Sequence, residues 1–134
     1  MTAFNIPKLP LFVPGHRAII APKAAASGAD MVIIDLEDAV ADPDKDAARA
    51  QLENATLLSV PVAVRINSAD SPWFVADLHA VKSSPAAMVV LPKAESAADL
   101  AQVQEVIGPD RPILPIIETA VSYTHLTLPT KRIV

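Results

Sequence analysis

The sequence predicts an α/β fold built around a parallel sheet. Short apolar runs rich in Val and Ile alternate with longer Ala-rich stretches, which is the pattern of strand and helix in repetition. The runs are apolar along most of their length, as is typical of parallel strands buried on both faces. Successive runs start at positions 11, 31, 62, 87 and 113, and this spacing leaves room for a crossover helix between neighbouring strands.

The composition fits one globular domain that binds small molecules. Of its 134 residues, 51% are hydrophobic and 19% are charged, which is ample for a core. A formal charge of −4 without a Lys or Arg cluster argues against nucleic acid or an acidic membrane surface as a partner. The absence of cysteine excludes disulfides, thiolate metal sites and a catalytic thiol. With neither a signal-peptide pattern nor an apolar run of roughly 18 residues, we expect a cytoplasmic protein without a membrane span.

Five strands and four helices follow in order. The strands are predicted over 11–13, 31–36, 62–66, 87–92 and 113–118. The helices between them are predicted near 18–28, 44–57, 72–83 and 96–107. Polar side chains are expected to cap the last three helices: Asp42 or Asp44, Ser71 and Ser96. Gly28 and Gly108 stand where helices are expected to end.

The pattern alone leaves two architectures open, a doubly wound open sheet and a β/α barrel. No G-x-G-x-x-G sequence follows the first strand and no Walker lysine loop is present, which disfavours the nucleotide-binding versions of the open sheet. In both architectures, ligands bind at the carboxyl ends of the strands.

Polar residues collect at these strand ends. They are Asp35 and Glu37 after the second strand, Arg65 and Asn67 after the third, Lys93 and Glu95 after the fourth, and Glu118 after the fifth. Within each pair the spacing is two, so both side chains can point the same way.

This set predicts chemistry on a carbon–carbon bond through an enolate. Carboxylates beside Arg65 and Lys93 suit a hard divalent cation and an anionic substrate, because Mg²⁺ takes one or two carboxylates plus substrate oxygens and polarises a carbonyl. Arg65 would bind a substrate carboxylate through its planar donors. Two alternatives stay open: Glu37 forms a structural ion pair with Lys93 or Arg65, and Asp35 has a hydrogen-bonded structural role rather than a metal-linked one.

Five motifs give the sequence a family resemblance over about residues 9–120. "LFVPGHR", "SGADMVIIDLEDAV", "VAVRIN", "VVLPKAES" and "PIIET" occur in the order and spacing found in one family. The chain resembles the HpcH/HpaI aldolase and citrate lyase β-subunit family, the CitE-like CoA-ester lyases. The resemblance implies a (β/α)₈ TIM barrel, of which this chain supplies about five units, and Mg²⁺ as the cofactor. It also implies cleavage or formation of acyl-CoA esters of the citryl-, malyl- or citramalyl-CoA type, with a keto or hydroxy acid as the second substrate.

The resemblance assigns roles to five residues. Arg65 matches the arginine that binds the acid, and Glu118 matches the first metal-binding glutamate. Asp35 and Glu37 match the acidic motif near the metal, and Lys93 matches the lysine of the L-P-K turn. The same resemblance implies a homo-oligomeric parent protein.

The sequence departs from the family pattern near its start and at its end. Lys8 replaces an arginine that we expect near the mouth of the active site. The second metal-binding aspartate and the last three barrel units are expected beyond residue 120. Instead, residues 121–134 hold three Thr within seven positions, whereas residues 1–120 hold three in all. This tail resembles a translated sequencing adaptor, so we expect a native domain over 1–120 and a non-native tail over 121–134.

Two other functions remain as alternatives to the CoA-ester lyase. One is an aldolase that cleaves a free 2-keto acid without CoA, and the other is a non-catalytic scaffold or binding subunit. Five of eight barrel units would leave two unpaired strand edges, so we expect the isolated chain to be marginally stable and inactive.

Overall fold

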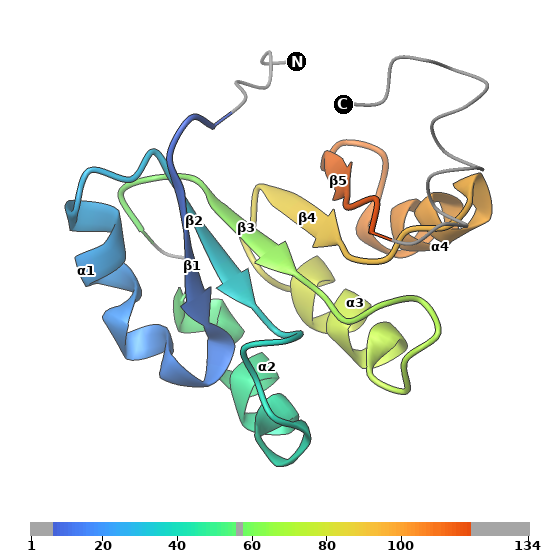
Figure 1. The fold of residues 1–134 in the computed structure, drawn as a ribbon, viewed down its shortest axis with the longest axis horizontal. Helices are drawn as coiled ribbons and strands as arrows, with labels where there is room; N and C mark the ends of the chain where they lie inside the picture. Colours follow the sequence, from blue (N-terminus) through green and yellow to red (C-terminus); the bar gives the residue numbers. More distant parts are fainter. Residues whose placement is uncertain (1–6, 56–57, 119–134) are drawn as a thin grey trace.

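The computed structural model describes residues 7–55 and 58–118, which are coloured in Figure 1. The tail predicted over 121–134 lies outside these residues, as does the end of the helix predicted over 44–57.

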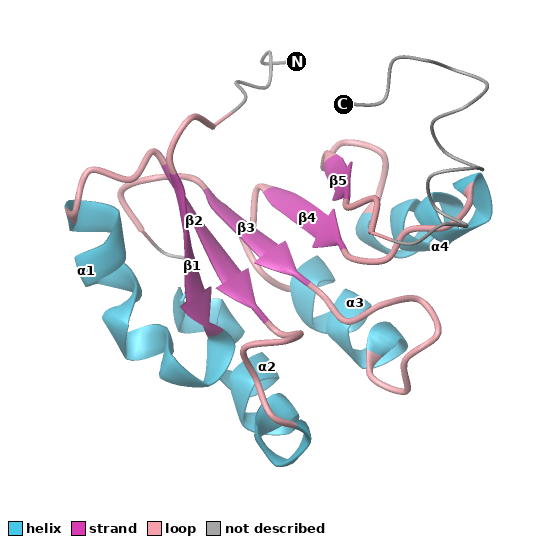
Figure 2. Ribbon diagram, viewed as in Figure 1, coloured by secondary structure: helices cyan, strands magenta, loops and turns pink. Residues whose placement is uncertain are grey.

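Five parallel strands form one sheet in sequence order (Figures 1 and 2). They are β1 (Pro10–Pro14), β2 (Met31–Asp35), β3 (Val62–Arg65), β4 (Met88–Leu91) and β5 (Ile113–Pro115). A doubly wound sheet reverses its strand order at a switch point, whereas a β/α barrel adds strands one after another. The order β1-β2-β3-β4-β5 therefore confirms the predicted incomplete barrel, and the open-sheet alternative is wrong.

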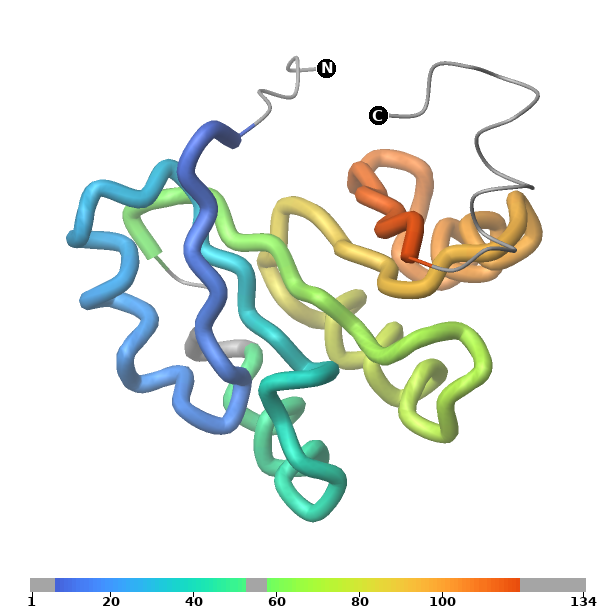
Figure 3. Tube along the Cα trace, viewed as in Figure 1, coloured from blue at the N-terminus to red at the C-terminus, as the bar shows by residue number. Residues whose placement is uncertain are grey.

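Helical segments connect the strands, and Figure 3 follows the chain through these crossovers. They are η1 (Gly15–Ile20) and α1 (Ala21–Ala26), η2 (Asp42–Asp44) and α2 (Lys45–Ala55), α3 (Phe74–Lys82), and α4 (Ala97–Ile107). All four predicted helices are present. The first is split, because Pro22 stands in the first turn of α1 and has no N–H with which to continue the preceding 3₁₀ segment. Within the described residues, no helix has the length and apolar character of a membrane span.

The predicted helix caps are partly correct. The Ser96 hydroxyl accepts a hydrogen bond from the Asp99 amide at 3.4 Å, which confirms the cap of α4. The cap at Ser71 is wrong, since α3 begins after Trp73 and the buried Ser71 hydroxyl has no partner among the described residues. Asp42 and Asp44 lie inside η2, which no side-chain hydrogen bond caps, because Pro43 favours a tight 3₁₀ turn before the helix.

The sheet has two apolar faces of different character. On one face, strand residues such as Val32, Val64 and Val89 pack with Leu52 and Leu78 of the helices. On the other face a smaller cluster comes from strands alone: Met31, Ile33, Ala63, Met88 and Val90. This second face corresponds to the interior of a barrel, where side chains from neighbouring strands form layers.

Side chains alternate between the two faces along each strand, and this alternation places polar residues at the strand ends on the second face. Met31 and Ile33 belong to the strand-only cluster, so Asp35 and Glu37 continue on that side of the sheet. Ala63 and Arg65 follow the same rule on β3. The polar side chains therefore stand directly above the apolar interior layer, at the carboxyl edge of the sheet.

Gly15 allows β1 and η1 to pass close to this edge. A Cβ atom at Gly15 would lie 2.9 Å from the carbonyl oxygen of Asp35 and 3.0 Å from Cβ of Ala48. Only a residue without a side chain fits between β2 and α2 at this point.

Candidate active site

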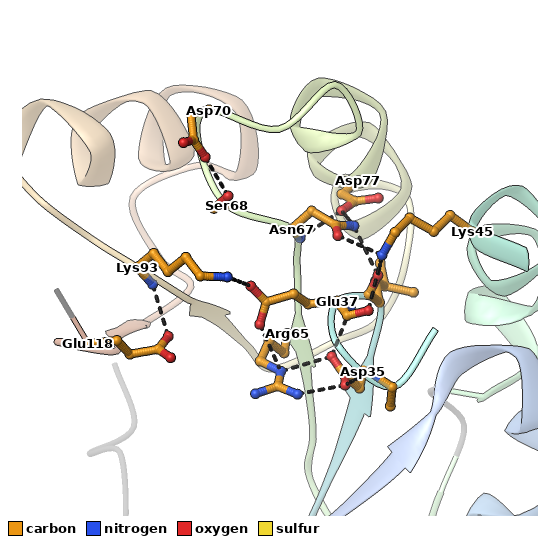
Figure 4. Close-up of polar contacts among 12 residues, drawn as sticks. Asp35, Glu37, Lys45, Arg65, Asn67, Ser68, Asp70, Asp77, Lys93 and Glu118 are labelled. Carbon is orange, nitrogen blue, oxygen red and sulfur yellow. Dashed lines mark hydrogen bonds and ion pairs between the residues drawn. The ribbon is translucent and has the colours of Figure 1, made fainter. Parts of the chain in front are cut away.

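Arg65 and Asp35 form a two-point ion pair at the carboxyl edge of the sheet (Figure 4). They are the last residues of neighbouring strands and stand opposite each other in the β2–β3 register. Arg65 Nε donates to Asp35 Oδ1 at 2.8 Å, and Nη2 donates to Oδ2 at 2.6 Å. The parallel register thus converts two distant sequence positions into one planar contact.

The same carboxylate also organises the loop that follows β2. Asp35 Oδ1 accepts the amide of Glu37 at 2.8 Å, and Oδ2 accepts the amide of Ala39 at 2.9 Å. Asp35 is fully buried, and burial raises its pKa, but the hydrogen bonds from Arg65 and the two amides outweigh burial and lower that pKa below its ordinary value. Both oxygens are therefore committed to protein donors, which is the hydrogen-bonded role that the sequence left open.

Glu37 is held between two cations. Its Oε2 accepts a hydrogen bond from Lys93 Nζ at 3.1 Å, and its Oε1 lies 3.7 Å from Arg65 Nε. Burial raises the pKa of Glu37 above its ordinary value, and Lys93 only partly offsets this effect. The ion pair between Glu37 and Lys93, one of the alternatives from the sequence, is present.

Lys93 joins the second, fourth and fifth strands at this edge. Its side chain reaches Glu37, while its backbone amide donates to Glu118 Oε1 at 3.1 Å (Figure 4). Lys93 has a φ of 50°, in the left-handed region that most residues avoid. The hydrogen bond that Lys93 donates to the Glu37 carboxylate raises the pKa of the ammonium, so Lys93 stays charged.

Phe12 completes the surroundings of Arg65. The guanidinium carbon of Arg65 lies 4.7 Å from the centre of the Phe12 ring, a cation–π distance. Phe12 is about half exposed on β1. Arg65 Nη1 donates no hydrogen bond within the described residues, so one edge of the guanidinium remains available to a ligand.

The carboxylates do not form a complete metal site among the described residues. In that part of the chain, no group of three or more His, Asp or Glu side chains is close enough to hold one ion. Asp35 and Glu37 are already bound by cations, whereas the exposed Glu118 accepts, from the part of the chain that the structure describes, one bond from the Lys93 amide. Because Mg²⁺ often takes only one or two protein carboxylates, Glu118 fits as one ligand of an ion completed by oxygens from elsewhere.

The structure changes the interpretation of Lys8. Its backbone amide bonds Asp30 Oδ2 at 2.7 Å, just before β1 begins. Lys8 is therefore at the amino end of the sheet, opposite the edge that carries Arg65. The expectation that Lys8 lies near the mouth of the site is wrong, because a strand separates the two ends.

Sequence reasoning missed Lys45 and Asp77, which are buried beneath the loop after β2. Asp77 Oδ2 accepts the side-chain amide of Asn67 at 2.6 Å, and burial raises the pKa of Asp77. Asn67, noted at the end of the third strand, turns toward these residues rather than toward Arg65 (Figure 4). A lysine in the first turn of a polar helix carries no sequence signal of burial.

Comparisons with known proteins agree with the geometry of the site. The model of the HpcH/HpaI aldolase/citrate lyase family matches residues 8–112. The chain belongs to this family. A (3S)-malyl-CoA thioesterase from Cereibacter sphaeroides is 40% identical to this chain over 115 residues, covering 82% of this chain and 40% of that protein. Citrate lyase subunit beta from Escherichia coli K12 is 38% identical over 101 residues, covering 72% of this chain and 33% of that protein.

Solved structures show the same fold. The CitE protein from Mycobacterium tuberculosis, crystallised with magnesium, acetoacetate and coenzyme A, matches with a TM-score of 0.76 and 38% identity. The match covers 87% of this chain and 41% of that one. A citrate lyase beta subunit from the same organism, complexed with oxaloacetate and magnesium, matches with a TM-score of 0.73 and 37% identity, covering 86% of this chain and 49% of that one. This HpcH/HpaI family chain therefore spans less than half the length of these relatives.

Proposed function

We propose that this chain forms part of a Mg²⁺-dependent carbon–carbon lyase that acts on CoA esters of hydroxy acids. The observation that carries the proposal is Arg65, whose guanidinium is fixed by Asp35 at the carboxyl edge beside Glu37, Lys93 and Glu118. A fixed guanidinium with one free edge suits a small carboxylate, because the planar donors match its two oxygens.

Each residue at the edge has a role in the proposed reaction. Arg65 binds and orients the acid portion of the substrate, and Asp35 keeps the guanidinium in plane. Glu118 holds the magnesium ion, which when bound polarises a carbonyl and stabilises negative charge on an enolate. Glu37, whose pKa burial raises, is proposed to exchange a proton with the substrate, and the charged Lys93 holds it beside Arg65.

A groove beside this edge offers room for a substrate. It has a volume of about 380 Å³ and is lined in part by Glu37, Lys45, Asn67, Trp73 and Lys93. The acyl-CoA class is supported by the relatives, one named a malyl-CoA thioesterase and another crystallised with coenzyme A. The small-acid class is supported by the acetoacetate and oxaloacetate in the solved structures.

An assay of the complete gene product tests the proposal. By complete gene product we mean the protein encoded by the natural open reading frame that contains these residues. Citryl-, malyl- and citramalyl-CoA are supplied with and without Mg²⁺, and keto acid release is measured. We expect release from at least one ester that depends on Mg²⁺ and is lost in Arg65→Met. Cleavage of free hydroxy acids alone would instead support the aldolase that acts without CoA. If neither class of substrate is cleaved, the non-catalytic scaffold would be the supported function.

We also propose that residues 1–120 are the amino-terminal part of a longer homo-oligomeric, cytoplasmic enzyme, and that 121–134 are not native to it. Two observations support the longer enzyme. The chain spans 40% of a malyl-CoA thioesterase, and β1 and β5 each pair with one strand among the described residues. Sequencing the natural locus beyond codon 120 tests it. An open frame with a further aspartate motif is expected, and a stop codon after Val134 would contradict it.

A further inference from the structure

Lys45 is a buried lysine near the site whose ammonium donates three hydrogen bonds to protein acceptors. It is the first residue of α2 and is only 5% exposed. Its ammonium donates to the carbonyl oxygen of Leu36 at 2.9 Å, to that of Glu37 at 3.0 Å, and to Asn67 Oδ1 at 2.8 Å (Figure 4). An ammonium has three protons, so these three acceptors use all of them.

This bonding excludes several ordinary roles for a lysine at an active site. An ammonium with three protein acceptors has no proton left to bind a substrate oxygen. The Trp73 ring lies 4.9 Å from Nζ, so the nitrogen faces an aromatic surface as well. Lys45 is therefore suited to hold other groups in place rather than to bind or attack a ligand.

The groups that it holds belong to the loop that carries Glu37. Lys45 binds the carbonyls of Leu36 and Glu37, while Asp35 binds the amides of Glu37 and Ala39. The backbone between Asp35 and Ala39 is thus restrained by a carboxylate and by an ammonium. Both restraints act on the backbone that carries the Glu37 side chain.

Asn67 extends this restraint to the third strand. Its Nδ2 donates to the carbonyl of Leu36 at 2.9 Å and to Asp77 Oδ2 at 2.6 Å, while its Oδ1 accepts from Lys45. The ends of β2 and β3 are therefore joined through Lys45 and Asn67, and α3 is joined to them through Asp77.

We propose that Lys45 is a positioning residue that sets the direction of Glu37 by binding the carbonyl oxygens of Leu36 and Glu37, which flank the Cα atom of Glu37. The consequence for catalysis rests on the proposed lyase function. The consequence for the loop does not, and the two can be tested separately.

Amide hydrogen exchange in the complete gene product tests the loop directly. In Lys45→Met, which keeps the side-chain length but has no donors, the amides of Glu37 and Ala39 should exchange at least about tenfold faster than in the wild type. The amides of Val89 and Val90 in β4 should change by less than about twofold. Equal acceleration at all four amides would show only a general loss of stability and would overturn the proposal.

Arg49→Met is the matched control. Arg49 Nε lies 3.3 Å from Asp77 Oδ1 and its side chain is 13% exposed, yet it contacts neither loop carbonyl. Its loss should leave exchange at Glu37 and Ala39 within about twofold of the wild type. If Lys45→Met does not fold, Lys45→Gln retains a donor and should accelerate the same two amides by a smaller factor; no local acceleration there would also overturn the proposal.

Kinetics supply the second readout. Removal of a group that orients a metal ligand typically costs roughly 10–100-fold in activity. By analogy, kcat of Lys45→Met should fall by about 10–100-fold while KM stays within about threefold. Arg49→Met should retain kcat. If the wild type shows no lyase activity, the proposed function fails, but the exchange experiment still decides whether Lys45 positions the loop. If the loop loosens without a fall in kcat, the positioning role in catalysis is wrong.

Discussion

Arg65 donates two hydrogen bonds to Asp35, its neighbour in the β2–β3 register, at 2.8 and 2.6 Å. The same carboxylate accepts hydrogen bonds from the backbone amides of Glu37 and Ala39 and so also restrains the loop after β2. The acid side of the pair is fully buried, and the Arg65 side chain is 18% exposed. This pair therefore fixes both the guanidinium that is proposed to bind substrate and the segment that carries Glu37.

Replacing Asp35 tests how much the ion pair between Asp35 and Arg65 contributes to the stability of the fold. Asp35→Asn should lower the free energy of unfolding by about 3 kcal/mol, since removing one partner leaves a largely buried charge uncompensated. The change is measured by urea denaturation of the complete gene product at neutral pH. Asp70→Asn is the control, because exposed Asp70 accepts a bond only from Ser68 among the described residues and should change stability by less than about 0.5 kcal/mol. Equal, small effects would contradict the account.

The lowered pKa of Asp35 predicts how stability depends on pH. A carboxyl group whose pKa is lower in the folded state than its unfolded value of about 3.9 stabilises the fold at higher pH. That stability is lost as pH falls through the folded pKa. Arg65→Met removes the strongest influence that opposes burial, so the pKa of Asp35 should rise and the loss of stability on acidification should shrink.

Urea denaturation at pH 7 and at pH 3 measures this effect. The difference between the two pH values should be smaller in Arg65→Met than in the wild type. Arg111→Met serves as a control, because Arg111 donates to the backbone carbonyls of Val81, Lys82 and Ser84 and, within residues 7–55 and 58–118, to no carboxylate. Its pH difference should match the wild type. If the stability difference between pH 7 and pH 3 is unchanged in Arg65→Met, Arg65 contributes little to the lowered pKa of Asp35.

Lys93 has a left-handed backbone conformation, and at such a position glycine is expected to stabilise the fold relative to alanine. In a helix the expected order is the reverse. With φ at 50°, a Cβ atom is strained, so Lys93→Gly should be more stable than Lys93→Ala by about 1 kcal/mol. Lys82 in α3 is the matched position, and there glycine should be less stable than alanine by about 1 kcal/mol. Thermal unfolding of the four variants decides it. Alanine as stable as glycine at position 93 would mean that the backbone is not strained there.

The sequence predicted the parts of this structure that depend on local pattern. Apolar periodicity located all five strands, and the strand-end rule brought Asp35, Arg65, Lys93 and Glu118 to one edge. The fifth strand is shorter than predicted, because Pro115 has no N–H to continue a regular ladder, although the amide of Ile116 still bonds Leu91.

Features that depend on tertiary contacts could not be read from the sequence. Whether Asp35 binds a metal or Arg65 is decided by the β2–β3 register, which places the two residues opposite each other. The burial of Lys45 depends on how α2 packs beneath the loop after β2, and a single lysine gives no periodic signal. The missing cap at Ser71 has a similar cause, since the turn at Pro72 and Trp73 delays the start of α3.

The position of the metal ion is the most direct test of the central claim, that the edge bearing Arg65, Lys93 and Glu118 is the catalytic site. Mn²⁺, which substitutes for Mg²⁺ and broadens nearby NMR signals, is titrated into the complete gene product. The amides of Glu37, Lys93 and Glu118 should broaden first, and Glu118→Gln should weaken Mn²⁺ binding at least about tenfold, whereas Glu105→Gln on the exposed side of α4 should not. Broadening confined to another part of the molecule, or unchanged binding in Glu118→Gln, would contradict the account.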